Sequence, residues 1–356
     1  MEKEAFLKKP TLRGIFYALA SLALIILGLI YFDRIIKPFF VAVIIWFIIK
    51  EIQKLIMKVS IGGKSLPAFW SRLLAFIFIG LVGFGIFELI SLNVEQMSEA
   101  GPDYREKLDR LVSEVGAFIN DPKIISYVRQ ALSKVNIAGL ITGLLNSLSS
   151  LLTDFAVVLV YIIFLLLEEK SFTKKVQVLF PGKGRKLYEF DRIMKKIDKA
   201  VGSYINQMVL ISLITGGFSY IALWIIGVDF PLLWAFLVFI LNFIPYIGPF
   251  ISSLLPAVFA VFQFGSLMYF VYVFAILEII QVILGNFVQP KMMGKSLNIS
   301  ALTVLFTLAF WGSIWGIVGM ILSVPITSIM IIVMSQIPQA KWIAILLSES
   351  GELGDR

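Results

Sequence analysis

The chain has 356 residues, of which 59% are hydrophobic and 15% charged, with a net charge of +8. Its mean hydropathy of +0.93 excludes a soluble protein, whose surface must be largely polar, so we expect an all-α integral membrane protein. The sequence contains neither Cys nor His, which excludes disulfides, thiolate or His metal sites and Ser-His-Asp hydrolysis. Excess Lys and Arg is typical of cytoplasmic loops near anionic lipid, so we expect no nucleic-acid partner.

Residues 1–92 are predicted to hold three transmembrane helices. A basic N-terminus precedes the uncharged segment from Gly14 to Phe32, which is too long for a signal peptide and has no cleavage pattern after it. A short second span follows from about Ile35 to Ile49, and a third ends near Leu92. The loop before the third span is basic, which places it and the N-terminus in the cytoplasm.

Residues 93–149 form a predicted extracytoplasmic helical insert, and its first part, residues 93–134, is rich in mixed charge. Apolar residues at 4-3-4-3 spacing indicate an amphipathic helix: Tyr104, Leu108, Leu111, Val115 and Phe118. A second such helix is indicated by Ile125, Val128, Leu132 and Val135. We interpret the insert as a cap or an oligomer contact, with a ligand-binding domain as the alternative.

Residues 150–199 contain a fourth span, which ends near Leu167, and a basic amphipathic helix. The apolar stripe of this helix lies beside four basic residues: Leu187, Phe190, Met194 and Ile197 beside Arg192, Lys195, Lys196 and Lys199. The pattern predicts a helix on the inner membrane surface, which either anchors the protein or regulates it.

The transport core is predicted over residues 200–335, and a cytoplasmic tail over 336–356. The core begins with an uncharged span, Ala200 to Val228, and holds two longer uncharged runs, Phe230 to Leu277 and Ser296 to Ala340. As one helix, either run would reach about 70 Å against a hydrocarbon core of about 30 Å, so each must break or fold back. Pro and Gly in the middle of both runs permit such breaks.

Charge placement favours re-entrant hairpins over full spans with kinks, because the loop bearing Lys291 and Lys295 then lies in the cytoplasm. Span plus hairpin over 200–263 would then repeat with opposite orientation over 266–335, an arrangement common in transporters. Backbone groups at a break need protein or a water-lined cavity to satisfy them. The residues at both breaks are therefore candidates for the substrate pathway: Asn242, Pro245, Gly248, Pro249, Gly312, Gly316 and Gly319. The alternative is a pair of kinked packing helices.

Three blocks of the core, in this order and spacing, carry a resemblance to a known family. They are Ser203-Tyr204-Ile205-Asn206-Gln207, Asn242-Phe243-Ile244-Pro245-Tyr246-Ile247-Gly248-Pro249 and Gly285-Asn286-Phe287-Val288-Gln289-Pro290-Lys291-Met292-Met293-Gly294-Lys295, continued by the segment from Phe310 to Pro325. With these blocks the sequence resembles the autoinducer-2 exporter (AI-2E, PerM-like permease) family. The resemblance implies about eight hydrophobic segments, an insert after the third, and export of the furanosyl quorum signal. For some relatives it implies exchange of sodium or lithium for protons.

Glu278 is the acidic residue deepest in an apolar run, where a carboxylate is costly and is usually functional or paired. It could load and release a proton; the alternative is a structural hydrogen bond to a neighbouring helix. Gln281, Gly285 and Gln289 follow at +3, +7 and +11 on one face, with Asn286 beside them. Further pathway candidates are Pro290, from the third block, and Asn206, Gln207 and Thr215 of the fifth span, which could instead join helices.

Together these patterns predict a secondary transporter that exports a small polar molecule, with autoinducer-2 as the first candidate and proton coupling if Glu278 titrates. The alternatives are a sodium (lithium)/proton antiporter and an oligomeric channel or facilitator. The absence of a P-loop motif for ATP supports a secondary transporter. An enzyme is disfavoured, since no buried Asp pair, Ser-base pair or His-rich metal site is evident. We expect no cofactor, a homo-oligomer, and a bacterial cytoplasmic membrane location with both termini inside.

Overall fold

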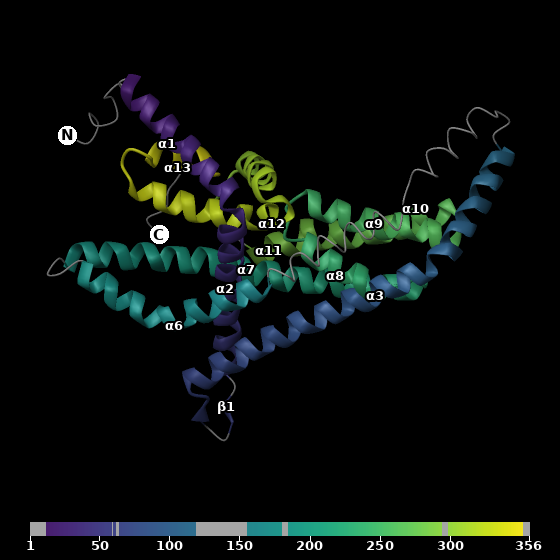
Figure 1. The fold of residues 1–356 in the computed structure, drawn as a ribbon, viewed down its shortest axis with the longest axis horizontal. Coiled ribbons are helices and arrows are strands. Elements are labelled where there is room, and N and C mark those ends of the chain that lie inside the picture. Colours follow the sequence, from purple (N-terminus) through teal and green to yellow (C-terminus); the bar gives the residue numbers. More distant parts are fainter. Residues whose placement is uncertain are drawn as a thin grey trace. The chain divides into compact units, whose positions relative to one another are not determined.

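The computed structural model describes residues 12–58, 60–61, 64–118, 155–179, 184–293 and 298–351. Apart from two short strands, the regular elements of these residues are helices (Figure 1), so the predicted all-α membrane fold is confirmed. Five of the described helices are long and apolar enough to cross a membrane, or up to six if a bent pair counts as one span. The described helices form two compact units, and each is considered by itself.

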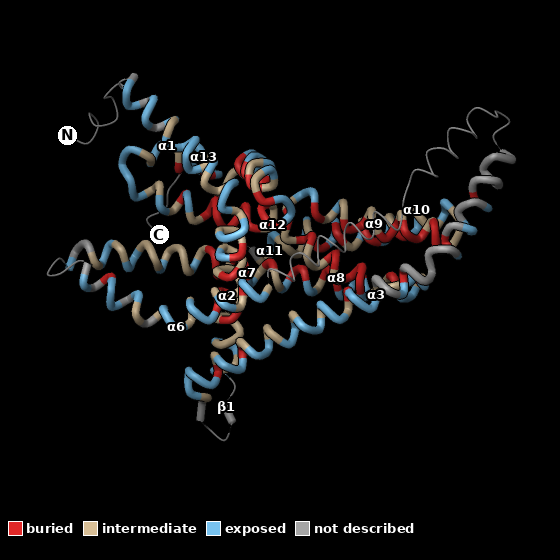
Figure 2. The backbone as a smooth tube through the Cα atoms, in the orientation of Figure 1, coloured by how far each residue is buried: buried red, intermediate tan, exposed pale blue. Residues whose placement is uncertain are grey.

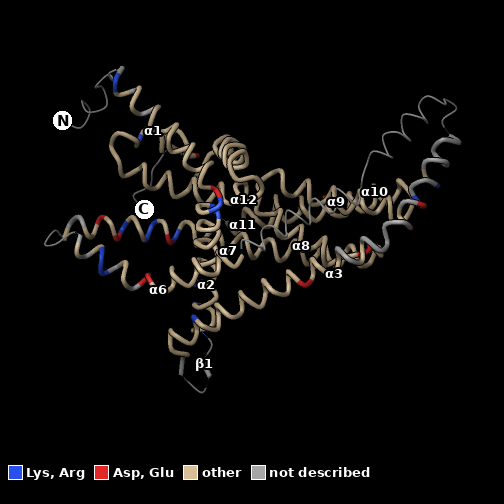
Figure 3. Tube along the Cα trace, viewed as in Figure 1, with Lys and Arg blue, Asp and Glu red and all other residues tan. Residues whose placement is uncertain are grey.

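The first unit contains α1 (Leu12–Tyr31), the first part of α2 (Asp33–Lys58), α6 (Phe155–Leu179), the first part of α7 (Gly184–Ile226), α12 (Ala301–Gln336) and α13 (Lys341–Leu347). The two spans predicted at the N-terminus correspond to α1 and α2, which meet at an 86° bend. Charged residues gather on the second half of α6 and the first half of α7, whereas α12 carries none (Figure 3). The basic amphipathic segment and the fifth span are thus parts of one helix, α7.

The second unit contains the rest of α2 and α7 together with β1 (Ser60–Ile61), β2 (Lys64–Ser65), α3 (Ala68–Phe118), α8 (Pro231–Leu241), α9 (Ile247–Phe264), α10 (Leu267–Ile283), a π-helical turn (Leu284–Val288) and α11 (Gln289–Met293). The strands pair antiparallel in the loop between α2 and α3. With 51 residues, α3 extends for about 75 Å and continues past Leu92 into the insert. The second predicted helix of the insert lies outside the described residues.

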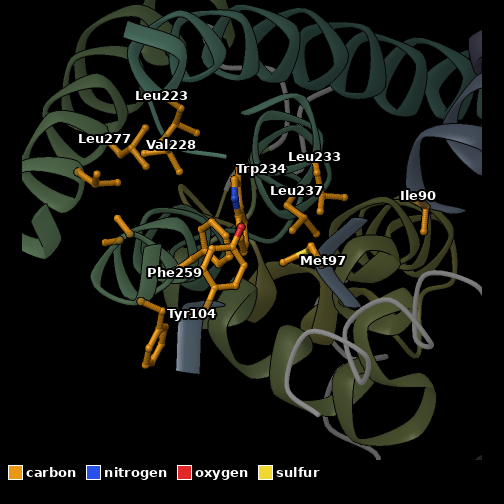
Figure 4. Packing of buried hydrophobic residues seen from close by; sticks show 14 residues of the cluster. Ile90, Met97, Tyr104, Leu223, Val228, Leu233, Trp234, Leu237, Phe259 and Leu277 are labelled. Atoms are coloured by element: carbon orange, nitrogen blue, oxygen red, sulfur yellow. The ribbon is translucent and has the colours of Figure 1, made fainter. Parts of the chain in front are cut away.

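The core of the second unit lies among α3, α8, α9, α10 and the end of α7. Trp234 of α8 and Phe259 of α9 are at its centre, with ring centroids 5.2 Å apart (Figure 4). Within this unit, burial is concentrated on α8 and α9 (Figure 2): 56% of the most apolar part of α9 is buried, against 11% of the most apolar part of α3. This contrast is expected if α9 is an inner helix and the first half of α3 faces lipid.

Candidate functional site

The run from Phe230 to Phe264 folds as a hairpin whose two ends are joined by one side chain. Gln263, near the end of α9, donates from Nε2 to the carbonyl oxygen of Gly227 at 2.8 Å. Its Oε1 accepts from the backbone N–H of Asp229 at 2.7 Å. Gly227 and Asp229 lie in the turn just before α8, so the start of α8 and the end of α9 meet. Over Phe230–Phe264 the chain therefore folds as a helical hairpin. That this hairpin is re-entrant in the membrane stays a prediction.

The tip of the hairpin is a break of five residues between α8 and α9, Asn242–Tyr246, which we call the first break. Tyr246 adopts a positive φ of 64°, a rare conformation for a residue other than Gly. Gly248 then passes so close to α8 that an added Cβ would lie 1.8 Å from the carbonyl oxygen of Leu241. Only Gly fits at this position, which explains why a Gly follows the Pro-Tyr-Ile sequence.

Buried polar side chains join this tip to the helices on either side. Asn242 donates from Nδ2 to the Ser212 hydroxyl of α7 at 3.0 Å, and Gln281 of α10 donates from Nε2 to the Ser252 hydroxyl of α9 at 3.0 Å. Ser252 in turn donates to the carbonyl oxygen of Pro249 at 2.8 Å, as Ser253 does at 3.1 Å. We call the following group the polar seam, and all of its members are buried: Ser212, Asn242, Ser252, Ser253 and Gln281.

Glu278 lies one helical turn before Gln281 on α10 and is partly buried. Its Oε1 atom is buried and has no hydrogen-bond partner among the residues that the structure describes. The same holds for the Ser219 hydroxyl of α7. A buried polar atom without a partner is costly and calls for an explanation. Within the described chain, Oε1 thus lacks the neighbouring-helix hydrogen bond that a purely structural Glu278 would make.

The candidates on α7 do not form one site. Thr215 is buried, but its hydroxyl donates to the carbonyl oxygen of Ile211 in the same helix at 2.8 Å. Asn206 is exposed and Gln207 is half-buried. Nine residues of an α-helix make two and a half turns, so Asn206 and Thr215 lie on opposite faces.

The candidates beyond Gln281 are separated from it by the π-helical turn, Leu284–Val288. This turn replaces i→i+4 bonds by i→i+5 bonds, so the single polar face predicted to run through Gly285 and Gln289 is interrupted. Asn286 and Pro290 are exposed. The structure therefore brings Asn242 and Gln281 into the polar seam, with Gly248 and Pro249 at the same tip, and leaves Asn286 and Pro290 outside it.

The second uncharged run is broken at Gly316, which has φ 63° and ψ −142° inside α12; we call this the second break. In a straight helix, residues 311 and 319 would be about 12 Å apart along the axis. Here an added Cβ on Gly319 would lie 1.9 Å from the carbonyl oxygen of Trp311, and one on Gly312 would lie 2.9 Å from the side chain of Met320. The three glycines predicted for this segment thus meet at one sharp bend in the first unit.

Sequence reasoning missed the partners of the predicted residues, Ser212 and Ser252, as well as Gln263. A signal for Ser212 was present, because Ser212, Gly216 and Ser219 recur at i, i+4 and i+7, a pattern of small residues typical of close helix packing. At Gly216 an added Cβ would lie 3.0 Å from the carbonyl oxygen of Ala235, so α7 and α8 do pack closely there.

Comparison with known proteins gives the same assignment as the sequence blocks. Residues 19–339 match the family described as AI-2E family transporter. A putative transport protein of Borreliella burgdorferi is 28% identical over 97% of this chain and 93% of its own length. A putative transport protein of Haemophilus influenzae is 28% identical over 95% and 96%. The AI-2 transport protein TqsA of Escherichia coli is 28% identical over 95% and 97%. The chain is therefore a multi-pass membrane protein that belongs to the AI-2E transporter family.

Proposed function

We propose that this protein is a secondary transporter that exports a small polar molecule past the first break, with autoinducer-2 as the first candidate substrate. The observation that carries the proposal is the polar seam, which collects buried hydroxyl and amide groups at the tip of a hairpin in a highly apolar protein. The substrate candidate comes from the name of one relative, the AI-2 transport protein of Escherichia coli.

The length of α8 supports a pathway at this tip. With 11 residues, α8 spans about 16 Å, roughly half of a hydrocarbon core of about 30 Å. If the base of the hairpin lies at a membrane surface, the first break lies near the midplane, where transporters with broken helices bind their substrates. Irregular backbone at that depth is tolerated where it lines a cavity or is covered by protein.

The hydrogen bonds of the polar seam are weak enough for the two amides to exchange their serine partners for hydroxyl groups of a substrate. Interhelical hydrogen bonds inside membrane proteins contribute on average only about 0.6 kcal/mol each. The hydroxyl groups of a polyhydroxylated substrate can therefore replace Ser212 as partner of Asn242, or Ser252 as partner of Gln281, at little cost. Specificity would arise because a less polar molecule that displaced these serines would leave the two amides unpaired.

Glu278 provides a candidate for coupling to the proton gradient. A carboxylate one turn from Gln281 can accept a proton from one side of the membrane and release it to the other as the hairpin changes position. The unpartnered Oε1 also favours a second candidate function, because a carboxylate that alternates between Na⁺ and a proton is the simplest sodium/proton antiporter site. The basic residues before and after the first two spans support a cytoplasmic N-terminus in a bacterial membrane.

The experiment uses purified protein in proteoliposomes that contain either autoinducer-2 or sodium. Gln281→Leu removes one of the two side-chain amides of the polar seam, and Gln336→Leu makes the same change at an exposed position. We expect autoinducer-2 flux that exceeds the flux from protein-free liposomes. This flux should be lost in Q281L and kept in Q336L. Sodium flux alone would select the antiporter function. Equal flux in Q281L and wild type would reject the polar seam as the pathway.

A further inference from the structure

The base of the α8–α9 hairpin is covered by the part of α3 beyond the apolar segment Ala68–Asn93. Along this helix, Ile90, Met97, Tyr104 and Leu111 are buried at a spacing of seven residues, so they lie on one face. The first three belong to the core cluster that contains Phe259 of α9. The Tyr104 ring meets Phe259 edge to face, with centroids 5.3 Å apart (Figure 4).

Two polar contacts join the same face of α3 to the two ends of the hairpin. Tyr104 donates from its hydroxyl to Asp229 Oδ2 at 2.9 Å, just before α8. Lys107, one turn later, donates from Nζ to the carbonyl oxygen of Gln263 at 2.9 Å, near the end of α9. Since the Gln263 side chain itself binds Gly227 and Asp229, the contacts form one network. We call its four members the hairpin latch: Tyr104, Lys107, Asp229 and Gln263.

The contacts of the hairpin latch hold α3 against the base of the hairpin but can be broken reversibly. Burial, followed by the hydrogen bond to Asp229 and the charge of that residue, raises the pKa of the Tyr104 hydroxyl above its ordinary value. Tyr104 therefore remains a hydrogen-bond donor at any physiological pH. Asp229 and Lys107 are exposed, so water can replace each of their contacts, and such exposed polar contacts are individually weak.

We propose that the extramembrane part of α3 is a gate: the hairpin latch holds the base of the α8–α9 hairpin and must release it in each transport cycle. This inference rests on the proposed function, because a hairpin that moves past a substrate has to change its contacts at the base as well as at the tip. The long, continuous α3 packs on α8 and α9 through the apolar face described above. While the latch is closed, the base of the hairpin cannot separate from α3.

A reversible cross-link tests this directly, because the chain contains no native Cys. A Cβ added at Gly265 would lie 3.6 Å from the Cβ of Lys107, inside the range of about 3.5–4.5 Å that disulfides require. The double variant K107C/G265C would therefore fix α3 to the turn between α9 and α10. Gly265 has a positive φ of 63°, so the single variant G265C carries the same backbone strain and serves with K107C as a matched control.

In proteoliposomes, we expect flux of autoinducer-2 or sodium through oxidised K107C/G265C to fall at least tenfold and to return on reduction, while both single variants are unaffected by oxidant. Undiminished flux through the fully cross-linked protein would show that α3 does not have to release the hairpin. This result would overturn the proposal and leave α3 with a structural role. Failure of the disulfide to form on oxidation would also overturn it. Absence of flux in wild type and in the reduced double variant would instead count against the proposed function.

A second measurement needs no transport assay. Tyr104→Phe removes the hydroxyl donor and keeps the ring on Phe259. We expect the amide protons of Asp229 and Trp234 to exchange with solvent several-fold faster in Y104F, because the latch no longer holds the turn before α8. Unchanged exchange at these amides would show that Tyr104 does not restrain the hairpin base, and would overturn the latch whatever the substrate is.

Discussion

The two broken runs of the C-terminal half each turn at a glycine that lies against a backbone carbonyl oxygen. In the first break, Gly248 lies against the carbonyl oxygen of Leu241; in the second, Gly319 lies against that of Trp311. An added Cβ would come within 1.8 Å and 1.9 Å of these oxygens. In each case a Gly without a Cβ lets the chain turn sharply back along the helix it has just left.

The side chains around the two breaks differ in kind. Asn242 joins the first break to the buried hydroxyl of Ser212, whereas aromatic rings pack at the second. There the ring centroid of Trp315 is 5.1 Å from that of Trp311 and 5.5 Å from that of Phe40. The Trp315 Nε1 donates to the carbonyl oxygen of Leu29, which fixes the ring. We infer that the first break lines the substrate pathway and that the second mainly packs helices together.

The largest expected effect is common to both breaks. Gly248→Ala and Gly319→Ala each force a methyl group into a carbonyl oxygen, so we expect about 3 kcal/mol or more of destabilisation and a steep loss of folded protein. Gly217→Ala is the matched control, since nothing lies within 4 Å of its added Cβ. Thermal unfolding in detergent checks this. Equal midpoints for G248A and G217A would show that the turn at the first break is not as tight as described.

The next effect separates the breaks. Asn242→Leu keeps the size of the side chain but removes the donor to Ser212, and we expect flux to fall about tenfold or more. The stability cost should stay within about 1.7 kcal/mol, the upper range for interhelical hydrogen bonds in membranes. Flux per folded molecule in proteoliposomes is the measurement. A variant N242L that transports normally would remove the distinction between the two breaks.

At the second break we expect the reverse pattern. Trp315→Phe keeps an aromatic ring but loses the bond to Leu29, which should lower stability by about 1 kcal/mol and leave flux per folded molecule unchanged. Unfolding and flux are measured on the same preparation. Loss of flux at unchanged stability would assign the second break to the substrate pathway as well.

The smallest effect is expected at Thr215. Its hydroxyl is satisfied by Ile211 of the same helix, so Thr215→Val should change the free energy of unfolding by less than about 0.5 kcal/mol and leave flux unchanged. A large loss of flux in T215V would extend the polar seam along α7.

The sequence allowed the helical fold, both breaks and two members of the polar seam to be predicted, because run length, breakers and buried amides are local signals. It could not show that Asn242 pairs with Ser212 or Gln281 with Ser252, since those partners are separated by about 30 residues and meet only in the folded chain. The π-helical turn after α10 has no local signature either, so the polar face predicted from the sequence continues past the point where this turn interrupts it. The inverted orientation of the two hairpins stays a prediction.

Proton coupling through Glu278 is tested most directly by comparing two glutamates that both lie in apolar helices. Wild type, Glu278→Gln and the control Glu88→Gln, an exposed acid of α3, are placed in proteoliposomes with an imposed pH gradient, and flux of autoinducer-2 and of sodium is followed. We predict gradient-dependent flux that is lost in E278Q and retained in E88Q. Flux that changes neither with the gradient nor with the E278Q substitution would contradict proton coupling through Glu278 and leave this residue with a structural role.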